Sequence, residues 1–185
     1  MELMEAIKSR RSIRSYKPDT IEEEKLNQIF EAVRWAPSWA NTQCWEFIVV
    51  KNPETKKKLS ETLSKGNPAT DAVKTAPIVL VACAKKGVSG YKRGEPMTSK
   101  GDWYMFDMGL AIQNLTLAAH SLGLGTVNIG AFNAEEVAKI LGVPENIEVV
   151  ELIPLGYPEK IPNPPPRKNI EEFVFYEKYG NKQKS

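Results

Sequence analysis

A short basic segment near the amino end, KSRRSIRSYK at residues 8–17, has the residue types of an anion-binding site. It contains five basic residues and no acidic one, with serines beside three closely spaced arginines, Arg10, Arg11 and Arg14. Guanidinium groups and hydroxyls suit phosphate oxygens, in bidentate and single contacts. A bound phosphate would also relieve the repulsion among the three cations. The residue types of the segment are therefore compatible with phosphate binding.

Two other interpretations of the same cluster stay open from the residues alone. Cations at the end of a helix interact favourably with its carbonyl groups, so the arginines could lie at a solvated helix terminus. Nucleic acid offers the same phosphate chemistry. However, 25 basic and 23 acidic residues give a net charge of +2, which provides no basic face beyond this cluster. We therefore expect no nucleic-acid partner.

A second stretch that could do chemistry is RWAPSWANTQCWEF at residues 34–47. Ser38, Asn41 and Gln43 place hydroxyl and amide groups among tryptophans, between a predicted helix end and a strand start. Such groups can hydrogen-bond a planar heterocycle while apolar neighbours cover it. An ordinary polar turn with core tryptophans would have the same composition.

The elements that must position these segments follow from apolar periodicity and capping residues. Thr20 is predicted to cap the helix that Pro37 ends, and Asn133 and Gly142 are predicted to bound another. The helix over 103–122 is apolar around most of its surface, which is typical of the centre of a domain or a dimer. Further helices are expected at 3–10, at 53–66 and just before residue 76.

Short stretches rich in apolar residues predict the strands. We expect buried strands over 44–51, 76–84 and 147–156, a short strand within 123–132, and a strand-like aromatic segment near the carboxyl end, VFYEKY. Few strands and many helices in an irregular order predict a single α+β domain over residues 1–185. Residues 85–102 contain four glycines and no periodicity, which is typical of a lid or a disordered segment.

Several classes of protein are not expected. The amino end lacks the apolar core of a signal peptide, and Cys44 and Cys83 form no CxxC motif, so we expect a cytoplasmic protein with free thiols. The most apolar stretch, 103–125, contains Asp107 and other polar residues, which argues against a membrane span. Metal binding has no support from ligand spacing. His120, the only histidine, is expected to be a satisfied core residue.

Five motifs together resemble the nitroreductase family over essentially the whole chain. They are RRSIR, APSWANTQCWEF, AAHSLGLGTVNIG, LIPLGYP and PPRK, in the order and spacing of that family. The resemblance implies an α+β sandwich, with a central, mostly antiparallel sheet flanked by helices, in an intertwined homodimer. It also implies FMN sites at the subunit interface, each built from both chains. Residues 162–185 would then be an extended segment that wraps onto the partner subunit.

The resemblance also implies which residues bind the cofactor. The phosphate would be held by the basic motif and by a distant arginine, and Arg14 would lie at the N1/O2 side of the flavin, where a cation stabilises the reduced form. The stretch around Ser38 would approach FMN from the partner subunit, and the NIG motif would place a backbone N–H at flavin N5. The cofactor-binding residues implied are Arg10, Arg11, Ser12, Arg14, Pro37, Ser38, Trp39, Asn41, Asn67, Asn128, Ile129, Gly130 and Arg167.

One position departs from the family motif. The family usually has N-x-Q-P-W, whereas this chain has NTQCW, with Cys44 in place of proline. Cys44 would be a small buried hydrophobic residue, or a thiol near the flavin. Trp103 and Tyr104, together with the loop at 85–102, would lie over the open flavin face and bind the substrate.

For function, the resemblance implies an FMN-dependent oxidoreductase. Hydride would pass from NADH or NADPH through FMN N5 to a small aromatic acceptor, such as a nitroaromatic or a quinone, in a ping-pong cycle without a catalytic side chain. Two alternatives stay open. One is another reaction of the same fold, reductive dehalogenation or flavin fragmentation, and the other is a flavin-binding store or sensor without turnover.

Overall fold

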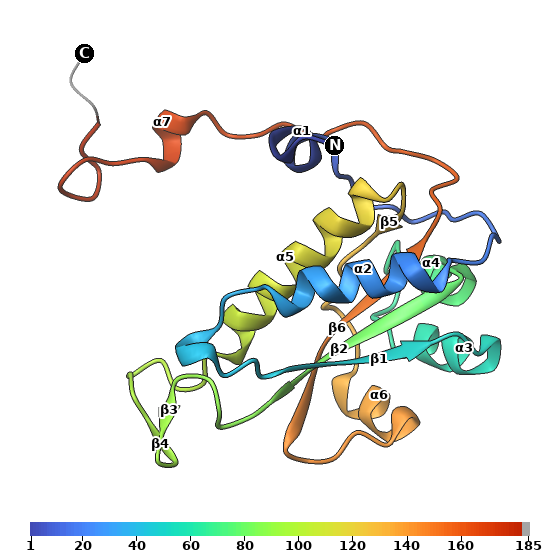
Figure 1. Ribbon diagram of the computed structural model, residues 1–185, viewed down its shortest axis with the longest axis horizontal. Helices are drawn as coiled ribbons and strands as arrows, with labels where there is room; N and C mark the ends of the chain where they lie inside the picture. The colour runs from blue at the N-terminus through green and yellow to red at the C-terminus, as the bar shows by residue number, and fades with distance from the viewer. Residues whose placement is uncertain (183–185) are drawn as a thin grey trace.

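The centre of the protein is a four-stranded antiparallel sheet. A computed structural model describes residues 1–182. The strand order is β1-β2-β6-β5, with β1 at one edge and every neighbouring pair antiparallel (Figure 1). The strands are β1 (Trp45–Val50), β2 (Ile78–Lys85), β6 (Ile147–Gly156) and the short β5 (Gly125–Thr126). The three predicted buried strands and the short fourth strand are thereby confirmed.

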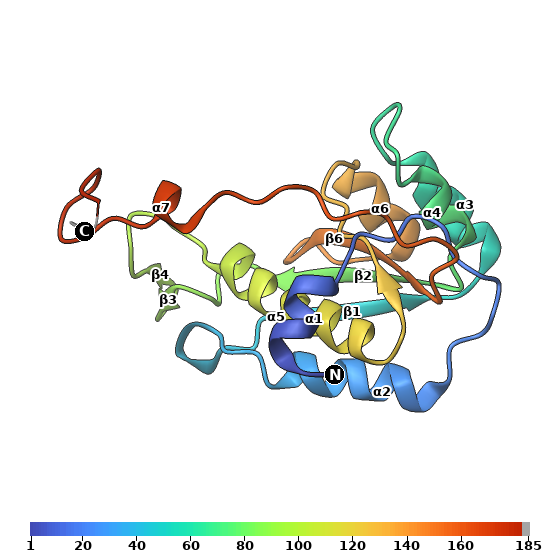
Figure 2. The same ribbon diagram turned by 90° about the horizontal axis from the view of Figure 1, so that it is seen from above.

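Helices cover both faces of this sheet. On one face lie α2 (Glu23–Arg34) and α5 (Tyr104–Ser121), and on the other lie α3 (Pro53–Glu61), α4 (Thr70–Thr75) and α6 (Ala134–Leu141) (Figure 2). The remaining elements are α1 (Leu3–Ser9), the 3-10 turn η1 (Trp39–Asn41), the strands β3 (Tyr91–Lys92) and β4 (Glu95–Pro96), and α7 (Ile170–Phe173). The α+β class and the flanked antiparallel sheet match the prediction.

Strand β2 explains why apolar runs predicted the strands so well. Its residues alternate between the two faces, so Val79 and Val81 pack with α3, α4 and α6, whereas Leu80 and Ala82 pack with α2 and α5. Both faces are covered, and therefore both alternating sets must be apolar. The predicted helix caps at Asn133 and Gly142 are also confirmed, since Asn133 accepts the Glu136 N–H at 3.0 Å and Gly142 has a φ of 68°.

Some predicted boundaries were wrong. Helix α2 begins at Glu23 after Glu22, not after a Thr20 cap. Helix α3 ends at Glu61, five residues before Gly66. The aromatic segment from residue 174 forms no strand, because none of the strands in the described chain lies beside it to complete a ladder.

Two segments extend beyond the layers of the sandwich. Residues 85–102 carry the small hairpin of β3 and β4. After β6 the chain runs along the molecule as an extended segment and carries α7 far from the sheet (Figure 1). Of the segment predicted to wrap the partner, residues 183–185 lie outside the described residues. Within residues 1–182, none of the helices has both the length and the apolar character that a membrane span requires.

Candidate functional site

The basic motif is held as an extended segment beside the short strand β5. The Ile13 N–H donates to the Thr126 carbonyl at 2.9 Å, and Ser12 forms a parallel bridge with Thr126. Ile13 and Tyr16 are buried, while the intervening Arg14 is exposed. The Tyr16 hydroxyl donates to the Ile13 carbonyl at 2.7 Å, which fixes the segment further. The backbone therefore holds the arginines at the surface, with the apolar residues as anchors.

Gly125 is what lets this segment approach the sheet. A Cβ added at Gly125 would lie 2.5 Å from Cγ1 of Ile13, a distance that packed carbon atoms do not reach. Only glycine therefore fits opposite Ile13, and Gly125 lets the arginine-bearing segment lie beside β5. Sequence reasoning had assigned Gly125 no role.

Arg10 lies among cations that are not neutralised. Its pKa is lowered, first by burial and then by the neighbouring charges of Arg11 and Arg167. The structure thus places Arg167, from the carboxyl-terminal segment, near enough to Arg10 for their charges to interact. Among residues 1–182, no ion pair includes Arg10, Arg11, Arg14 or Arg167. Such a cluster would be stabilised by a bound anion.

Arg11 also lies at a helix terminus, as the first alternative interpretation of the cluster expected. Its Nη1 donates to the carbonyls of Lys8 and Arg10, both at 2.7 Å, at the end of α1. One arginine therefore caps the helix and still contributes its charge to the cluster. The two interpretations apply to different atoms of the same motif.

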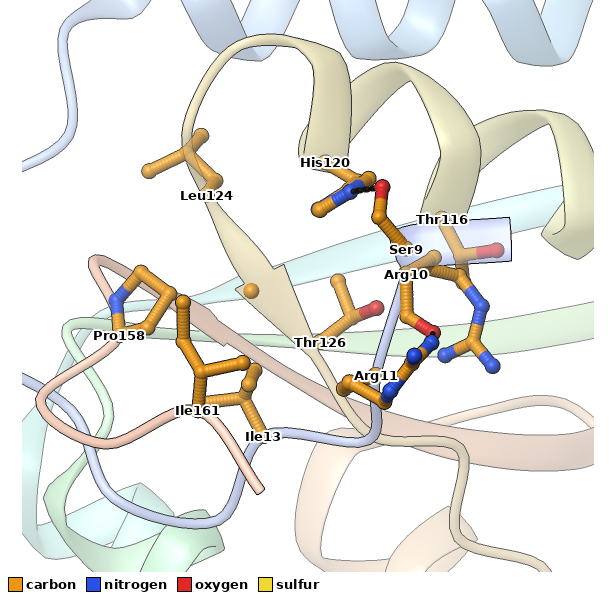
Figure 3. A pocket seen from close by; sticks show the side chains of 11 residues that line it. Ser9, Arg10, Arg11, Ile13, Thr116, His120, Leu124, Thr126, Pro158 and Ile161 are labelled. Carbon is orange, nitrogen blue, oxygen red and sulfur yellow. Dashed lines mark hydrogen bonds between the residues drawn. The ribbon is translucent and has the colours of Figure 1, made fainter. Parts of the chain in front are cut away.

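A small pocket lies between the basic motif and the end of α5 (Figure 3). His120 lines it, and its Nε2 lies 2.7 Å from Oγ of Ser9. The pKa of His120 is lowered by burial and by the charges of Arg10 and Arg11. Sequence reasoning gave His120 no chemistry. The sequence does contain a signal, because Thr116 and His120 are four residues apart and so lie on one face of a helix. In the structure both residues line this pocket.

The second predicted segment lies at the opposite end of α5. Pro37 and Asn41 are exposed, while Ser38 and Trp39 are half-buried. The Trp39 ring packs on that of Trp103, with centroids 5.1 Å apart, and Trp103 packs edge-on against Phe106 at 5.5 Å. The structure therefore brings the predicted flavin-approaching loop against the predicted substrate residue.

Cys44 behaves as a buried hydrophobic residue. Its side chain has no exposed area, and burial together with the Asp107 carboxylate raises the pKa of its thiol to about 12. A thiol with that pKa carries almost no thiolate at neutral pH and is a poor nucleophile. Of the two roles considered for Cys44, the structure supports the structural one.

The two halves of the predicted site do not meet within one chain. Trp103 precedes the first turn of α5, whereas Thr116 is thirteen residues further along, beside Arg10. At 1.5 Å of rise per residue, about 20 Å of helix separates them. The basic motif and the loop at 37–41 of one chain therefore lie at opposite ends of α5.

The NIG motif forms a fixed edge beside β6. Ile129 and Leu152 exchange backbone hydrogen bonds, both at 3.1 Å, and Ile129 is buried. Gly130 is exposed, and in the described part of the chain no acceptor takes its N–H. Asn67 lies next to this edge, because its Nδ2 donates to the Ala131 carbonyl at 3.4 Å. A free backbone donor on a rigid edge can bind an acceptor atom of a planar ligand.

The space beside the Gly130 backbone is open. A Cβ built at Gly130 would have no heavy atom within 4 Å, so space is present for a ligand close to the backbone. Asn128, on the same edge, is also exposed.

For residues 1–182, no three His, Cys, Asp or Glu side chains are grouped to hold a metal ion.

Comparison with known proteins identifies the family. The family model described as the nitroreductase family matches residues 7–157. An FMN reductase (NAD(P)H) of Bacillus subtilis is 34% identical over 196 residues, which cover 97% of this chain and 75% of that protein.

Solved structures agree. A nitroreductase family protein from Clostridium novyi has a TM-score of 0.79 at 31% identity, with 98% of this chain and 97% of that chain covered. An FMN-dependent nitroreductase from Clostridium difficile has a TM-score of 0.79 at 29% identity, with 96% and 100% covered. Since the family model spans most of the chain and the fold agrees over nearly all of it, this chain belongs to the nitroreductase family.

Proposed function

We propose that this protein is an FMN-dependent oxidoreductase that passes hydride from NADH or NADPH to a small aromatic acceptor, such as a nitroaromatic or a quinone. The observation that carries the proposal is the cluster of unpaired arginines around Arg10, which would neutralise a phosphate. The related enzymes named for FMN and NAD(P)H support the same cofactor and reductant. When bound, FMN supplies an isoalloxazine ring that can accept a hydride at N5 and pass it on.

The arginines and Ser12 serve the phosphate end of the site. Arg10 and Arg167 would bind the phosphate in charge-assisted hydrogen bonds, with Ser12 and the remaining donors of Arg11 beside them. Arg14, exposed on the same extended segment, would lie along the pyrimidine side of the ring and favour negative charge there. These contacts would fix the position of the ring, and none of these side chains would take part in hydride transfer.

The NIG edge serves the reacting end. The free N–H of Gly130 would donate to N5, and the absence of a side chain at Gly130 lets the ring approach the backbone. Asn128, Ile129 and Asn67 would hold this edge and its polar contacts in place. Because the described hydrogen bonds already fix Ile129 to β6, the donor is pre-oriented.

A homodimer would complete the site. Because about 20 Å of helix separates the basic motif from the loop at 37–41, Pro37, Ser38, Trp39 and Asn41 would come from the partner chain. Helix α5 supports this, since Met105 and Phe106 on its outer side are 59% and 57% exposed in a single chain. An apolar helix face of this kind is typical of a subunit interface.

The carboxyl-terminal segment would extend the dimer contact. Residues 162–182 are exposed apart from half-buried positions near 174, and they include the apolar side chains of Ile170 and Phe173. A long segment that leaves its own domain and carries apolar residues suits a second copy of the chain. We therefore propose that this segment wraps the partner subunit.

Acceptor choice would lie with Trp103, Tyr104 and the lid at 85–102. Trp103 and Tyr104 are both half-buried at the start of α5, beside the hairpin of the lid. Aromatic rings there can stack on a nitroaromatic or a quinone without taking part in proton or hydride transfer. In the ping-pong order, the oxidised nicotinamide leaves before the acceptor occupies the same face.

The visible spectrum tests the proposal. Purified protein should carry or take up FMN, and the flavin band should bleach within the stopped-flow dead time or shortly after NADH or NADPH is added. Addition of a quinone or a nitroaromatic should restore the band, with the flavin intact. A flavin store without turnover would show no fast bleaching. A colourless, monomeric protein that does not take up FMN would overturn the proposal.

A further inference from the structure

A buried carboxylate ties three parts of the molecule together at the start of α5. Asp107 has no exposed area, and its Oδ1 accepts the Trp39 N–H at 3.0 Å. Its Oδ2 accepts the hydroxyl of Ser89, in the lid, at 2.6 Å, and lies 3.4 Å from the Thr42 hydroxyl. None of the ion pairs in residues 1–182 involves Asp107. The charge is therefore balanced by neutral donors from the loop and the lid.

The loop that Asp107 holds is strained. Ala40, Asn41 and Gln43 have φ values of 44°, 57° and 47°, in the left-handed region that residues with a Cβ rarely adopt. Such conformations persist only where the surroundings determine them, and they occur often at functional sites. Among the contacts that hold the loop in this shape are the Asp107 carboxylate, which accepts the Trp39 N–H, and the Ser38 Oγ, which accepts the Gln43 N–H at 3.0 Å.

The lid is fixed to the same carboxylate. Besides the bond from Ser89 to Asp107, the Trp103 N–H donates to the Ser89 carbonyl at 3.0 Å. The next residue, Gly90, packs so closely on Trp103 that an added Cβ would lie 2.5 Å from the ring. The lid, the Trp103 ring and the Trp39 ring therefore form one packed unit around Asp107.

We propose that Asp107 is a positioning residue that holds the strained loop at 38–43 in its ligand-binding shape and couples it to the acceptor lid. The proposal rests on the proposed function, since it assigns the loop to the flavin and the lid to the acceptor. Asp107 acts through Ser38, Asn41 and Trp103 and does not itself contact the reacting atoms. Loss of its carboxylate should let the loop relax into an unstrained shape and release the lid.

One test needs no cofactor. The indoles of Trp39 and Trp103, 5.1 Å apart and tilted by 42° to each other, should give an exciton couplet in the circular dichroism of the flavin-free protein, which Trp39→Phe should abolish and so assign. Asp107→Asn should reduce the couplet by at least half, because the amide replaces one acceptor oxygen with a donor. The control Asp19→Asn makes the same chemical change in an exposed segment and should leave the couplet intact.

A second test uses flavin and acceptor. Asp107→Asn should raise the Kd for FMN at least tenfold, whereas Asp19→Asn should leave it within twofold. Ser89→Ala removes only the hydrogen bond from the lid to the Asp107 carboxylate. This variant should therefore raise the acceptor KM at least threefold. Its Kd for FMN and its rate of flavin reduction by NADH should stay unchanged. A purely structural role would lower the melting temperature of these variants without this split between loop and lid.

The outcomes separate the two proposals. If the unaltered protein does not bind FMN, the proposed function fails, and the couplet still tests the positioning role of Asp107. If the unaltered protein binds FMN but Asp107→Asn keeps both its couplet and its FMN affinity, the positioning role is wrong and the function stands. If Asp107→Asn does not fold, Ser89→Ala decides, since an unchanged acceptor KM would overturn the coupling to the lid.

Discussion

The Nε2 atom of His120 lies 2.7 Å from Oγ of Ser9 and so joins the last turn of α5 to the last turn of α1 (Figure 3). The Ser9 hydroxyl donates its single hydrogen to the Glu5 carbonyl at 2.6 Å. Oγ of Ser9 must therefore accept, and Nε2 of His120 must carry the proton. This hydrogen bond places an ionisable ring beside the arginine cluster, where it can report on a bound anion.

His120 should therefore titrate differently with and without FMN. In the free protein, burial and the charges of Arg10 and Arg11 lower its pKa, so the ring is neutral at pH 7. A bound phosphate would offset the arginine charges and raise the pKa toward its ordinary value of about 6.5. Because His120 is the only histidine, its Cε1–H signal can be followed by NMR against pH without assignment. An identical pKa with and without FMN would place the phosphate elsewhere.

Arg10→Ala should weaken FMN binding about 10- to 100-fold, since a hydrogen bond to a charged group contributes about 1.5–3 kcal/mol. The folded flavin-free protein should not lose stability, because the Arg10 charge is disfavoured there by burial and by its cationic neighbours. Equilibrium titration of FMN and a thermal melt measure the two effects. Lys17→Ala is the matched control, since Lys17 is an exposed cation of the same segment. Arg14→Ala should also lose flavin, and the phosphate assignment fails if both arginine variants keep FMN near the unaltered Kd.

Local chemistry explains which parts of this structure the sequence could predict. Strand β2 is covered on both faces, so it had to be a continuous apolar run, and Asn133 and Gly142 had to bound α6 because each satisfies a specific backbone requirement. The aromatic segment near residue 175 has strand-forming residues as well. It forms no strand in the described chain, because a strand needs a neighbour and propensity alone does not supply one.

The candidate site also has some residues that the sequence could predict and others that it could not. The arginine motif could be found from residues 10–14 alone, because its function depends on charge type and short spacing. Asp107 could not, because its donors come from Trp39, Thr42 and Ser89, which are brought together only by the fold. In the sequence it served only as an argument against a membrane span. The close contact of Gly125 with Ile13 is likewise a tertiary fact without a local signal.

Gly109→Glu should separate dimer formation from folding. Gly109 lies on the exposed side of α5, and a Cβ there would have no heavy atom within 4 Å in a single chain. Glutamate forms helix better than glycine by roughly 0.5–1 kcal/mol, so the monomer should fold at least as well. A charge at the proposed subunit interface should nevertheless prevent association, and FMN should be lost although every arginine is intact.

Sedimentation velocity and FMN titration measure this prediction together. Gln28→Glu introduces the same side chain on the exposed side of α2 and serves as the control. A Gly109→Glu protein that remains a dimer would remove this face of α5 from the interface. A monomeric variant that still binds FMN with unaltered affinity would show that one chain suffices for the site, against the separation of about 20 Å along α5.

Glu151→Gln should change how stability depends on pH. Within residues 1–182, Oε2 of Glu151 is a buried oxygen without a hydrogen-bond partner, and burial raises the pKa of this carboxyl. The folded state then holds its proton more tightly than the unfolded state, whose pKa is about 4.3. The free energy of unfolding must therefore fall as the pH rises from about 4.3 through the raised value. Glutamine stays neutral, so the variant should lack this decrease.

Urea unfolding of the flavin-free protein at a series of pH values, at one fixed protein concentration, measures the difference. The midpoint of Glu151→Gln should exceed that of the unaltered protein increasingly across this range and by a constant amount above it. Glu61→Gln, at an exposed position at the end of α3, controls for the general loss of a negative charge. Equal midpoints for Glu151→Gln and the unaltered protein at every pH would mean that the Glu151 carboxylate has a partner when it ionises, because an unpartnered buried charge cannot be without cost.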